Sequence, residues 1–137
     1  MKIKLLRDDI MLPKKSHLPD VGLDIFMPED FSIEPFETKT IGLGLAVAIP
    51  EGFAGMIIPR SSIAAQGLII QTSVIDPDYT SEIHLIVTNC SKHKFTAEVG
   101  QRLCSLVMVS VLNAYIETTD VLISTTRGDQ GLGSTGK

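Results

Sequence analysis

Glycine and proline interrupt this chain at short intervals, and that spacing limits the length of any regular element. Among 137 residues, 11 are glycine and 7 are proline. The segments between them are short and apolar, and extended helical periodicity is absent. Short apolar segments bounded by turn-forming residues are typical of β-strands. The sequence therefore predicts an all-β sandwich or jelly-roll barrel built around one hydrophobic core.

Four segments have the composition of strands, and one has that of a helix. Residues 41–49 and 53–58 are apolar enough for buried strands, residues 83–88 alternate as in a half-exposed strand, and residues 103–112 suit a further core strand. A short helix is expected over residues 63–66, with Ser61 or Ser62 as its N-cap and Gly67 at its end. Residues 1–126 are expected to form the barrel domain, and residues 127–137 a flexible Gly-rich tail of the same functional unit.

The charge and the hydropathy of the chain exclude two classes of partner. Twelve Lys and Arg against sixteen Asp and Glu leave a net charge of −4, and no basic stripe is present for nucleic-acid phosphates. No run approaches the ~20 apolar residues of a membrane span, and residues 1–4 do not resemble a signal peptide. Cys90 and Cys104 lie in apolar stretches without a metal-ligand spacing, so both are expected to be reduced core residues. The expected location is the cytoplasm, or the nucleus for a eukaryotic or viral source.

Residues 74–79, Val-Ile-Asp-Pro-Asp-Tyr, place two carboxylates around a proline between apolar flanks. Such a segment is typical of a tight turn between strands, and Asp-Pro-Asp can serve as ordinary turn chemistry. Asp76 directly follows an apolar pair, so its carboxylate is expected to emerge beside the core. A carboxylate with a pKa near ~4 is ionised at neutral pH and can accept a proton from an attacking water. Tyr79 offers a flat ring on which a sugar could pack.

Other polar groups suit anions. Arg60, Ser61 and Ser62 come where a strand ends and the short helix begins, which places a cation, two hydroxyls and backbone donors together. Asp24 interrupts an apolar strand with a charge that is costly to bury unpaired, so it either reaches the water shell of a metal or pairs with Arg102. The tail combines glycines with Arg127, Ser134 and Thr135, a composition that fits a polyphosphate clamp. A flexible end without a ligand is the alternative.

In the order and spacing of five motifs, the chain resembles the trimeric dUTPase family over nearly its whole length. The matching segments are residues 21–25, 59–62, 74–79, 100–103 and 127–136. The resemblance implies a jelly-roll fold, a homotrimer with three shared sites, and hydrolysis of dUTP to dUMP and pyrophosphate with Mg²⁺. In that family the tail of one subunit closes over a site that two others form.

The resemblance also assigns roles to individual residues. Asp76 would activate the water that attacks the α-phosphorus, and Tyr79 would pack under the deoxyribose and disfavour a 2′-hydroxyl. Asp24 would hold waters of Mg²⁺, which the triphosphate itself mainly binds. Backbone groups of Gln71, Thr72, Ser73 and Val74 would read uracil. Phosphates and the closing tail would involve Arg60, Ser61, Ser62, Gln101, Arg127, Leu132, Gly133, Ser134 and Thr135.

Some positions depart from the family pattern. Leu132 replaces an aromatic residue that commonly covers the uracil, and Ser105 stands where a glutamine is frequent. Leu23 replaces another aromatic, and Thr80 and Ser81 replace the familiar Arg-Gly. Because base stacking contributes ~1–3 kcal/mol in single-strand binders, a leucine in the lid is expected to weaken substrate binding. Activity with altered affinity is the expectation.

Two rival functions belong to relatives of the same fold. A dCTP deaminase would need a glutamate and an arginine at the places that Ile86 and Ala65 occupy here, and neither side chain can transfer a proton. A regulatory or interaction module without catalysis would fit the departures at Leu132 and Ser105. Asp76 and the phosphate-binding tail favour the enzyme over this module.

Overall fold

The computed structural model describes residues 1–128, and these residues form strands with one short helix. The elements are β1 (Lys2–Leu5), β2 (Gly22–Phe26), β3 (Phe31–Ile33), β4 (Thr38–Gly42), β5 (Leu45–Ala48), β6 (Phe53–Pro59), α1 (Ser61–Ala64), β7 (Leu68–Ile70), β8 (Ser73–Ile75), β9 (His84–Asn89), β10 (Phe95–Ala97) and β11 (Arg102–Ser110). The predicted all-β class and the single short helix are confirmed. No helix in residues 1–128 is long and apolar enough to cross a bilayer.

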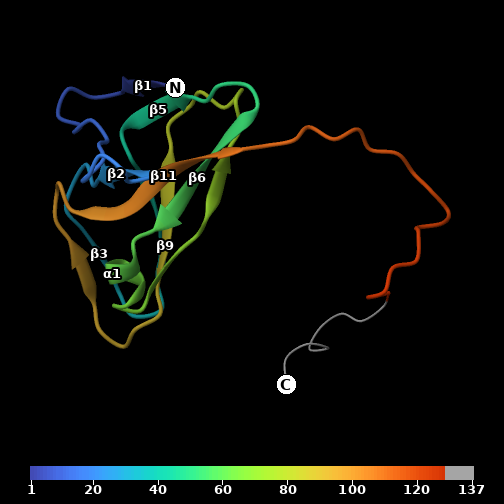
Figure 1. The fold of residues 1–137 in the computed structure, drawn as a ribbon. Coiled ribbons are helices and arrows are strands. Elements are labelled where there is room, and N and C mark those ends of the chain that lie inside the picture. Colours follow the sequence, from blue (N-terminus) through green and yellow to red (C-terminus); the bar gives the residue numbers. More distant parts are fainter. Residues whose placement is uncertain (129–137) are drawn as a thin grey trace.

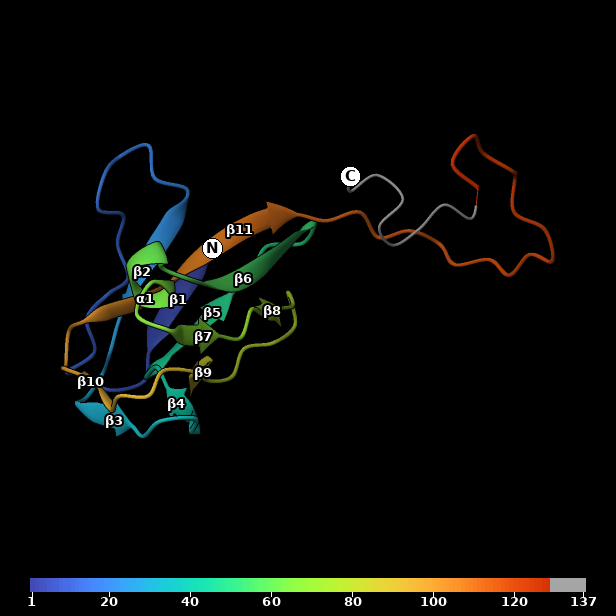
Figure 2. The ribbon, with the colours of Figure 1, turned by 90° about the horizontal axis from the view of Figure 1, so that it is seen from below.

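Two larger antiparallel sheets form the body of the protein (Figures 1 and 2). One has the strand order β2-β11-β6-β8, and the other has the order β4-β9-β7. Two smaller pairs, β1-β5 and β10-β3, flank them. Sequence neighbours are often not sheet neighbours: β8 pairs with β6 in one sheet, while β9 pairs with β4 and β7 in the other. The chain therefore crosses from one sheet to the other between residues 75 and 84.

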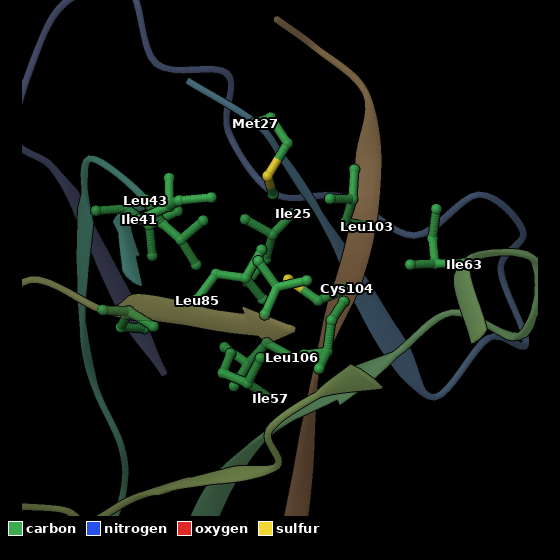
Figure 3. Packing of buried hydrophobic residues seen from close by; sticks show 14 of the residues in the cluster. Ile25, Met27, Ile41, Leu43, Ile57, Ile63, Leu85, Leu103, Cys104 and Leu106 are labelled. Carbon is green, nitrogen blue, oxygen red and sulfur yellow. The ribbon is translucent and has the colours of Figure 1, made fainter. Parts of the chain in front are cut away.

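Apolar side chains from both larger sheets make one core (Figure 3). Ile57 on β6, Leu85 on β9 and Leu106 on β11 are all at most 1% exposed. Each such side chain contributes about 1.5–3 kcal/mol when fully buried. Asn89 is buried as well, and its amide group donates to the backbone oxygens of Ile33 and His93 at 3.1 and 2.8 Å. A buried amide bonded in this way costs little.

The structure corrects three local expectations. Residues 41–49 are not one strand: they contain the end of β4 and the whole of β5, and Gly44 between the two has φ +68°, a left-handed conformation that glycine adopts readily. Arg60 occupies the N-cap of α1 without a side-chain hydrogen bond, so neither Ser61 nor Ser62 caps the helix. Cys104 is buried as expected, but Cys90 follows the last residue of β9 and is exposed. Both cysteines are free thiols.

Residues 111–128 form an extended arm that leaves the body after β11 (Figure 1). All of these residues are exposed, and several are large and apolar. The large apolar residues of the arm are Val111, Leu112, Tyr115, Ile116, Val121, Leu122 and Ile123. The division of the chain at residue 126 stays a prediction, because residues 129–137 lie outside the described part.

Candidate active site

A pocket of about 230 Å³ opens where the chain crosses between the two sheets. Its walls come from the end of β8, from the following loop and from β9. The lining residues are Ser73, Val74, Ile75, Asp76, Tyr79, Ile83, His84 and Ile86. The sequence suggested a tight turn between two strands, and the structure shows that these strands, β8 and β9, do not pair with each other. Because these two strands lie in different sheets, space remains between them for a ligand.

Asp76 and Tyr79 lie at the two ends of a turn at this pocket. The backbone N–H of Tyr79 donates to the carbonyl of Asp76 at 3.1 Å, and Pro77 occupies the second turn position, which its fixed φ favours. The Tyr79 hydroxyl donates to the carbonyl of Glu82 at 2.7 Å. Asp76 is exposed, and within residues 1–128 its carboxylate has no ion pair and no side-chain hydrogen bond. Its carboxylate is therefore open to water and to a ligand.

The pocket also presents unpaired backbone groups. β8 is the edge strand of its sheet, so the backbone groups that point away from β6 are not used by the sheet. Ser73 and Val74 line the pocket, whereas Gln71 and Thr72 do not. The Gln71 N–H instead donates to the carbonyl of Ile86 at 2.9 Å. Of the four residues expected to read a base, two are thus at the pocket in this chain.

A second pocket, of about 360 Å³, is lined by three of the predicted phosphate-binding residues, Arg60, Ser62 and Gln101. It lies beside α1 and the start of β11. Its polar lining comes from Arg60, Ser62, Gln66, Gln101 and Arg102. Ser61 is exposed next to it on α1. Two guanidinium groups and several neutral donors on one concave surface suit an anion with many oxygens.

Asp24 on β2 holds the two arginines together. Its Oδ2 accepts hydrogen bonds from Ser16 Oγ at 2.7 Å and from Arg102 Nη1 at 3.0 Å, and it lies 2.7 Å from Arg60 Nη1. Its Oδ1 accepts one hydrogen bond, from Ser105 Oγ at 2.9 Å. The expected pairing of Asp24 with Arg102 is confirmed. Arg60 Nη1 is close to the carboxylate but poorly aligned for a hydrogen bond. This nitrogen is buried, and it has no hydrogen-bond acceptor among the described residues.

These contacts set the ionisation of Asp24. Burial by itself would raise the pKa of this carboxyl group, but hydrogen bonds from Ser16 and Ser105 and the proximity of Arg60 more than offset that effect. The pKa of Asp24 is therefore below its ordinary value of 3.8. Asp24 is consequently a carboxylate at neutral pH, as a partner of two cations must be. Burial, and to a lesser degree the charge of Asp24, raises the pKa of the nearby Cys104 thiol to about 12, so this thiol is unreactive.

These two pockets are separate within residues 1–128. They share no lining residue: Asp76 and Tyr79 belong to the first, and Arg60 and Arg102 to the second. Arg127 is exposed in the arm, outside both. The tail residues Leu132, Gly133, Ser134 and Thr135 lie outside the described residues. In one chain, the residues expected to bind the sugar and those expected to bind phosphate therefore line separate pockets.

Two residues that contribute to the site were not predicted from the sequence, Ser16 and Glu82. Ser16, in the loop before β2, donates to Asp24 and accepts from Arg102 at 2.7 Å. Glu82 accepts the Tyr79 hydroxyl through its carbonyl and binds the Gly44 N–H through its carboxylate at 2.8 Å. The polar composition of residues 80–82 did not indicate either contact of Glu82. Both contacts form only when the loop has folded against the link between β4 and β5.

Within residues 1–128, no group of three or more His, Cys, Asp or Glu side chains could hold a metal ion.

Ile86 lines the first pocket and Ala65 follows α1, so the positions where a deaminase would carry acidic and basic groups are apolar here.

Comparison with known proteins identifies the family of this chain. A family model described as dUTPase matches residues 8–136. The deoxyuridine 5'-triphosphate nucleotidohydrolase of Corynebacterium glutamicum is 38% identical over 141 residues, which cover 100% of this chain and 95% of the relative. That of Clostridium tetani is 35% identical over 140 residues, with 100% and 97% covered. The structure of the Staphylococcus bacteriophage 80alpha dUTPase with dUPNHPP has a TM-score of 0.93 at 27% identity, and the match covers 99% of this chain and 98% of that one. The chain therefore belongs to the dUTPase family.

Proposed function

We propose that this protein hydrolyses dUTP to dUMP and pyrophosphate, with Asp76 as the base that deprotonates the attacking water. The exposed carboxylate of Asp76, at a pocket between an edge strand and a tyrosine, is the observation that carries the proposal. An ionised carboxylate that is engaged with no other side chain of residues 1–128 can take a proton from water as that water attacks the α-phosphorus. Hydrolysis at this bond leaves dUMP and releases pyrophosphate, which limits the dUTP available for incorporation into DNA.

The remaining assignments follow the two pockets. The free edge of β8, at Ser73 and Val74, can pair with the polar edge of uracil, and Tyr79 can pack against the deoxyribose. Arg60 and Arg102, held by Asp24, can neutralise phosphate charge. Phosphoryl transfer depends mainly on positioning and charge neutralisation, so this division of roles suits the reaction.

Magnesium fits the site as an ion held mainly by the substrate. No cluster of three acidic or imidazole ligands is available in residues 1–128, which agrees with a cation bound by triphosphate oxygens. Asp24 Oδ2 already faces three partners, but Oδ1 accepts only the Ser105 hydroxyl among the described residues. Oδ1 is thus the atom that can hold a water of Mg²⁺. When bound, the ion would neutralise charge on the phosphate oxygens.

A homotrimer would complete the site. Two observations support this part of the proposal: the two pockets do not merge within one chain, and the arm of residues 111–128 exposes large apolar side chains. Covering such side chains with a neighbouring subunit removes apolar surface from water, which stabilises the assembly. An arm on a second subunit can also carry Arg127 and the following tail to a site that other subunits form.

One assay tests the proposed function against its rivals. The protein is incubated with Mg²⁺ and either dUTP or dCTP, and both pyrophosphate and ammonia are measured. Pyrophosphate from dUTP alone is the expected result, and chelation of the metal with EDTA is expected to remove most of this turnover. Ammonia from dCTP would instead identify a deaminase. Binding of dUTP without any product would identify a regulatory module.

A further inference from the structure

Glu82 connects the loop of residues 76–83 to the link between β4 and β5. It is half-buried, whereas its neighbours Thr80 and Ser81 are exposed. Its carboxylate oxygen Oε1 accepts a hydrogen bond of 2.8 Å from the backbone N–H of Gly44, between β4 and β5. A Cβ atom built at Gly42 would lie 2.6 Å from the same oxygen, so the carboxylate rests directly on this stretch of backbone.

The backbone around Glu82 is fixed by neighbouring hydrogen bonds. The Leu43 N–H donates to the carbonyl of Ile83 at 2.9 Å, and the Ile83 N–H donates to the carbonyl of Leu45 at 2.9 Å. Ile83 is only 2% exposed. On the other side, the Leu6 N–H donates to the carbonyl of Gly44 at 2.8 Å. The link between β4 and β5 is therefore a rigid support, and the Glu82 side chain extends this support toward the exposed loop.

Tyr79 depends on the main chain of Glu82. Its hydroxyl donates to the carbonyl of Glu82 at 2.7 Å. A phenol has a single hydrogen to donate, so the Tyr79 hydroxyl cannot donate to a second acceptor while this bond is formed. Together with the turn that begins at Asp76, the bond holds the ring at the pocket from two directions.

We propose that Glu82 is a positioning residue that sets selectivity for 2′-deoxyribose by fixing the place of the Tyr79 ring. The path runs from the Gly44 N–H to the Glu82 carboxylate, then from the Glu82 carbonyl to the Tyr79 hydroxyl. The inference rests on the proposed function, in which Tyr79 packs against the sugar. A ring that is free to move away from the pocket leaves room for a 2′-hydroxyl, so discrimination against UTP falls.

In this proposal the reach of the Glu82 side chain matters, and its charge does not. A charge-based role is the competing explanation, because Glu82 also acts on Arg7 at a distance. Asp9 mainly, and Glu29 and Glu82 more weakly, raise the pKa of Arg7. Two substitutions separate reach from charge. Glu82→Asp keeps the charge but is one methylene too short for Gly44, whereas Glu82→Gln keeps the length and an acceptor oxygen but loses the charge.

The test measures kcat/KM of both variants for dUTP and for UTP. We expect Glu82→Asp to lower the dUTP-to-UTP ratio on the order of tenfold, as displaced sugar contacts should. Glu82→Gln is expected to stay within about twofold of the wild-type ratio, because its bond to Gly44 survives. Glu51→Asp and Glu51→Gln, in the exposed turn between β5 and β6, are matched controls that should leave the ratio unchanged. A wild-type ratio in Glu82→Asp, or an equal loss in Glu82→Gln, would overturn the inference.

A double-mutant cycle tests the path through the hydroxyl. Tyr79→Phe removes the bond to the Glu82 carbonyl and is expected to lower the ratio by itself. Adding Glu82→Asp to Tyr79→Phe should then change the ratio no further, because the two residues act in one chain of contacts. Additive losses in the double variant would contradict the path. An unchanged dUTP-to-UTP ratio in Tyr79→Phe would also contradict it, and this single variant decides the question even if Glu82→Asp does not fold. Failure of the wild type to hydrolyse dUTP would defeat this inference together with the proposed function, whereas a wild-type ratio in Glu82→Asp defeats the inference alone.

Discussion

Asp76 and Asp24 are both aspartates of the candidate site, but their surroundings suit them to different tasks. Asp76 is exposed and unpaired within residues 1–128, whereas the side chain of Asp24 is only 12% exposed and is bonded to two serines and paired with two arginines. A base must be free to take a proton, and an anchor for cations must keep its charge. Their environments therefore fit the roles proposed for them, catalysis for Asp76 and positioning for Asp24.

Substitution of the proposed base tests this assignment. Asp76→Asn keeps the shape of the side chain and removes its ability to accept a proton. We expect turnover of dUTP to fall by roughly 10²–10⁴, the range over which general bases contribute. Affinity for a non-hydrolysable dUTP analogue, measured by calorimetry, should change little. Normal turnover in Asp76→Asn would remove this residue from its role.

The network around Asp24 predicts a pH-dependent stability. Because the pKa of Asp24 is lowered in the folded state, its ionised form stabilises the fold above the ordinary pKa, and this stability is lost as the pH falls through the lowered value. Asp24→Asn should therefore cost roughly 1–3 kcal/mol at neutral pH, where the two arginines lose their partner. The difference from the wild type should disappear only at a pH below 3.8.

Urea unfolding across pH measures this difference. Asp120→Asn, in the exposed arm, makes the same change in net charge and should have no effect on the midpoint. If Asp24→Asn were as stable as Asp120→Asn at neutral pH, the network would contribute nothing to the fold.

At the scale of elements, the break between β4 and β5 supports the pocket, and it depends on Gly44. This residue has φ +68°, and a Cβ atom there would lie 2.4 Å from Ile10 Cδ1. Gly44→Ala should therefore lower the free energy of unfolding by about 1–3 kcal/mol, from the left-handed backbone and from the contact with Ile10. Gly52→Ala is a matched control, since Gly52 has φ +80° but nothing within 4 Å of the added Cβ.

Denaturant unfolding of both glycine variants separates the two causes. The control should lose only the backbone contribution. Ile10→Ala is destabilising by itself because Ile10 is buried, but its combination with Gly44→Ala should lose less stability than the sum of the two single variants. Equal losses in the two glycine variants would show that Ile10 simply moves aside.

Local patterns could be predicted from this sequence better than contacts between distant segments. The strand class, the short helix and the placement of Asp76 and Tyr79 at one turn depend on neighbouring residues, and the sequence predicts them. The break at Gly44 could not be seen, because a glycine inside an apolar run looks the same in a continuous strand. The bond of Ser16 to Arg102 joins residues 86 positions apart, so only the fold reveals it.

Register explains the remaining differences. Ser105, which departs from the family pattern, lies directly opposite Asp24 in the β11–β2 pairing. This register allows its hydroxyl to donate a hydrogen bond to the Asp24 carboxylate. Cys90 was expected in the core, but β9 ends one residue earlier, at Asn89. An apolar neighbourhood in sequence does not fix where a strand ends, and so it does not fix which side chains are buried.

At the scale of the whole molecule, the arm after β11 predicts how assembly and activity depend on the C-terminal part of the chain. Deleting residues 127–137 removes Arg127 and the predicted phosphate-binding tail but leaves the large apolar residues of the arm. We expect this shorter protein to remain a folded trimer with poor activity. Deleting residues 111–137 also removes the exposed apolar side chains, among them Tyr115 and Ile116. If these side chains are buried between subunits, the second deletion should weaken the trimer as well.

Light scattering coupled to size exclusion, together with dUTP turnover, distinguishes these outcomes. The full chain should have the mass of three copies, the first deletion should keep that mass with little turnover, and the second should show smaller species at low concentration. Replacing Tyr115 and Ile116 with serine in the full chain is a finer test, because it keeps the tail while removing apolar surface. Full activity after the first deletion would contradict the role of the tail, and a monomeric full chain with full activity would contradict the shared site.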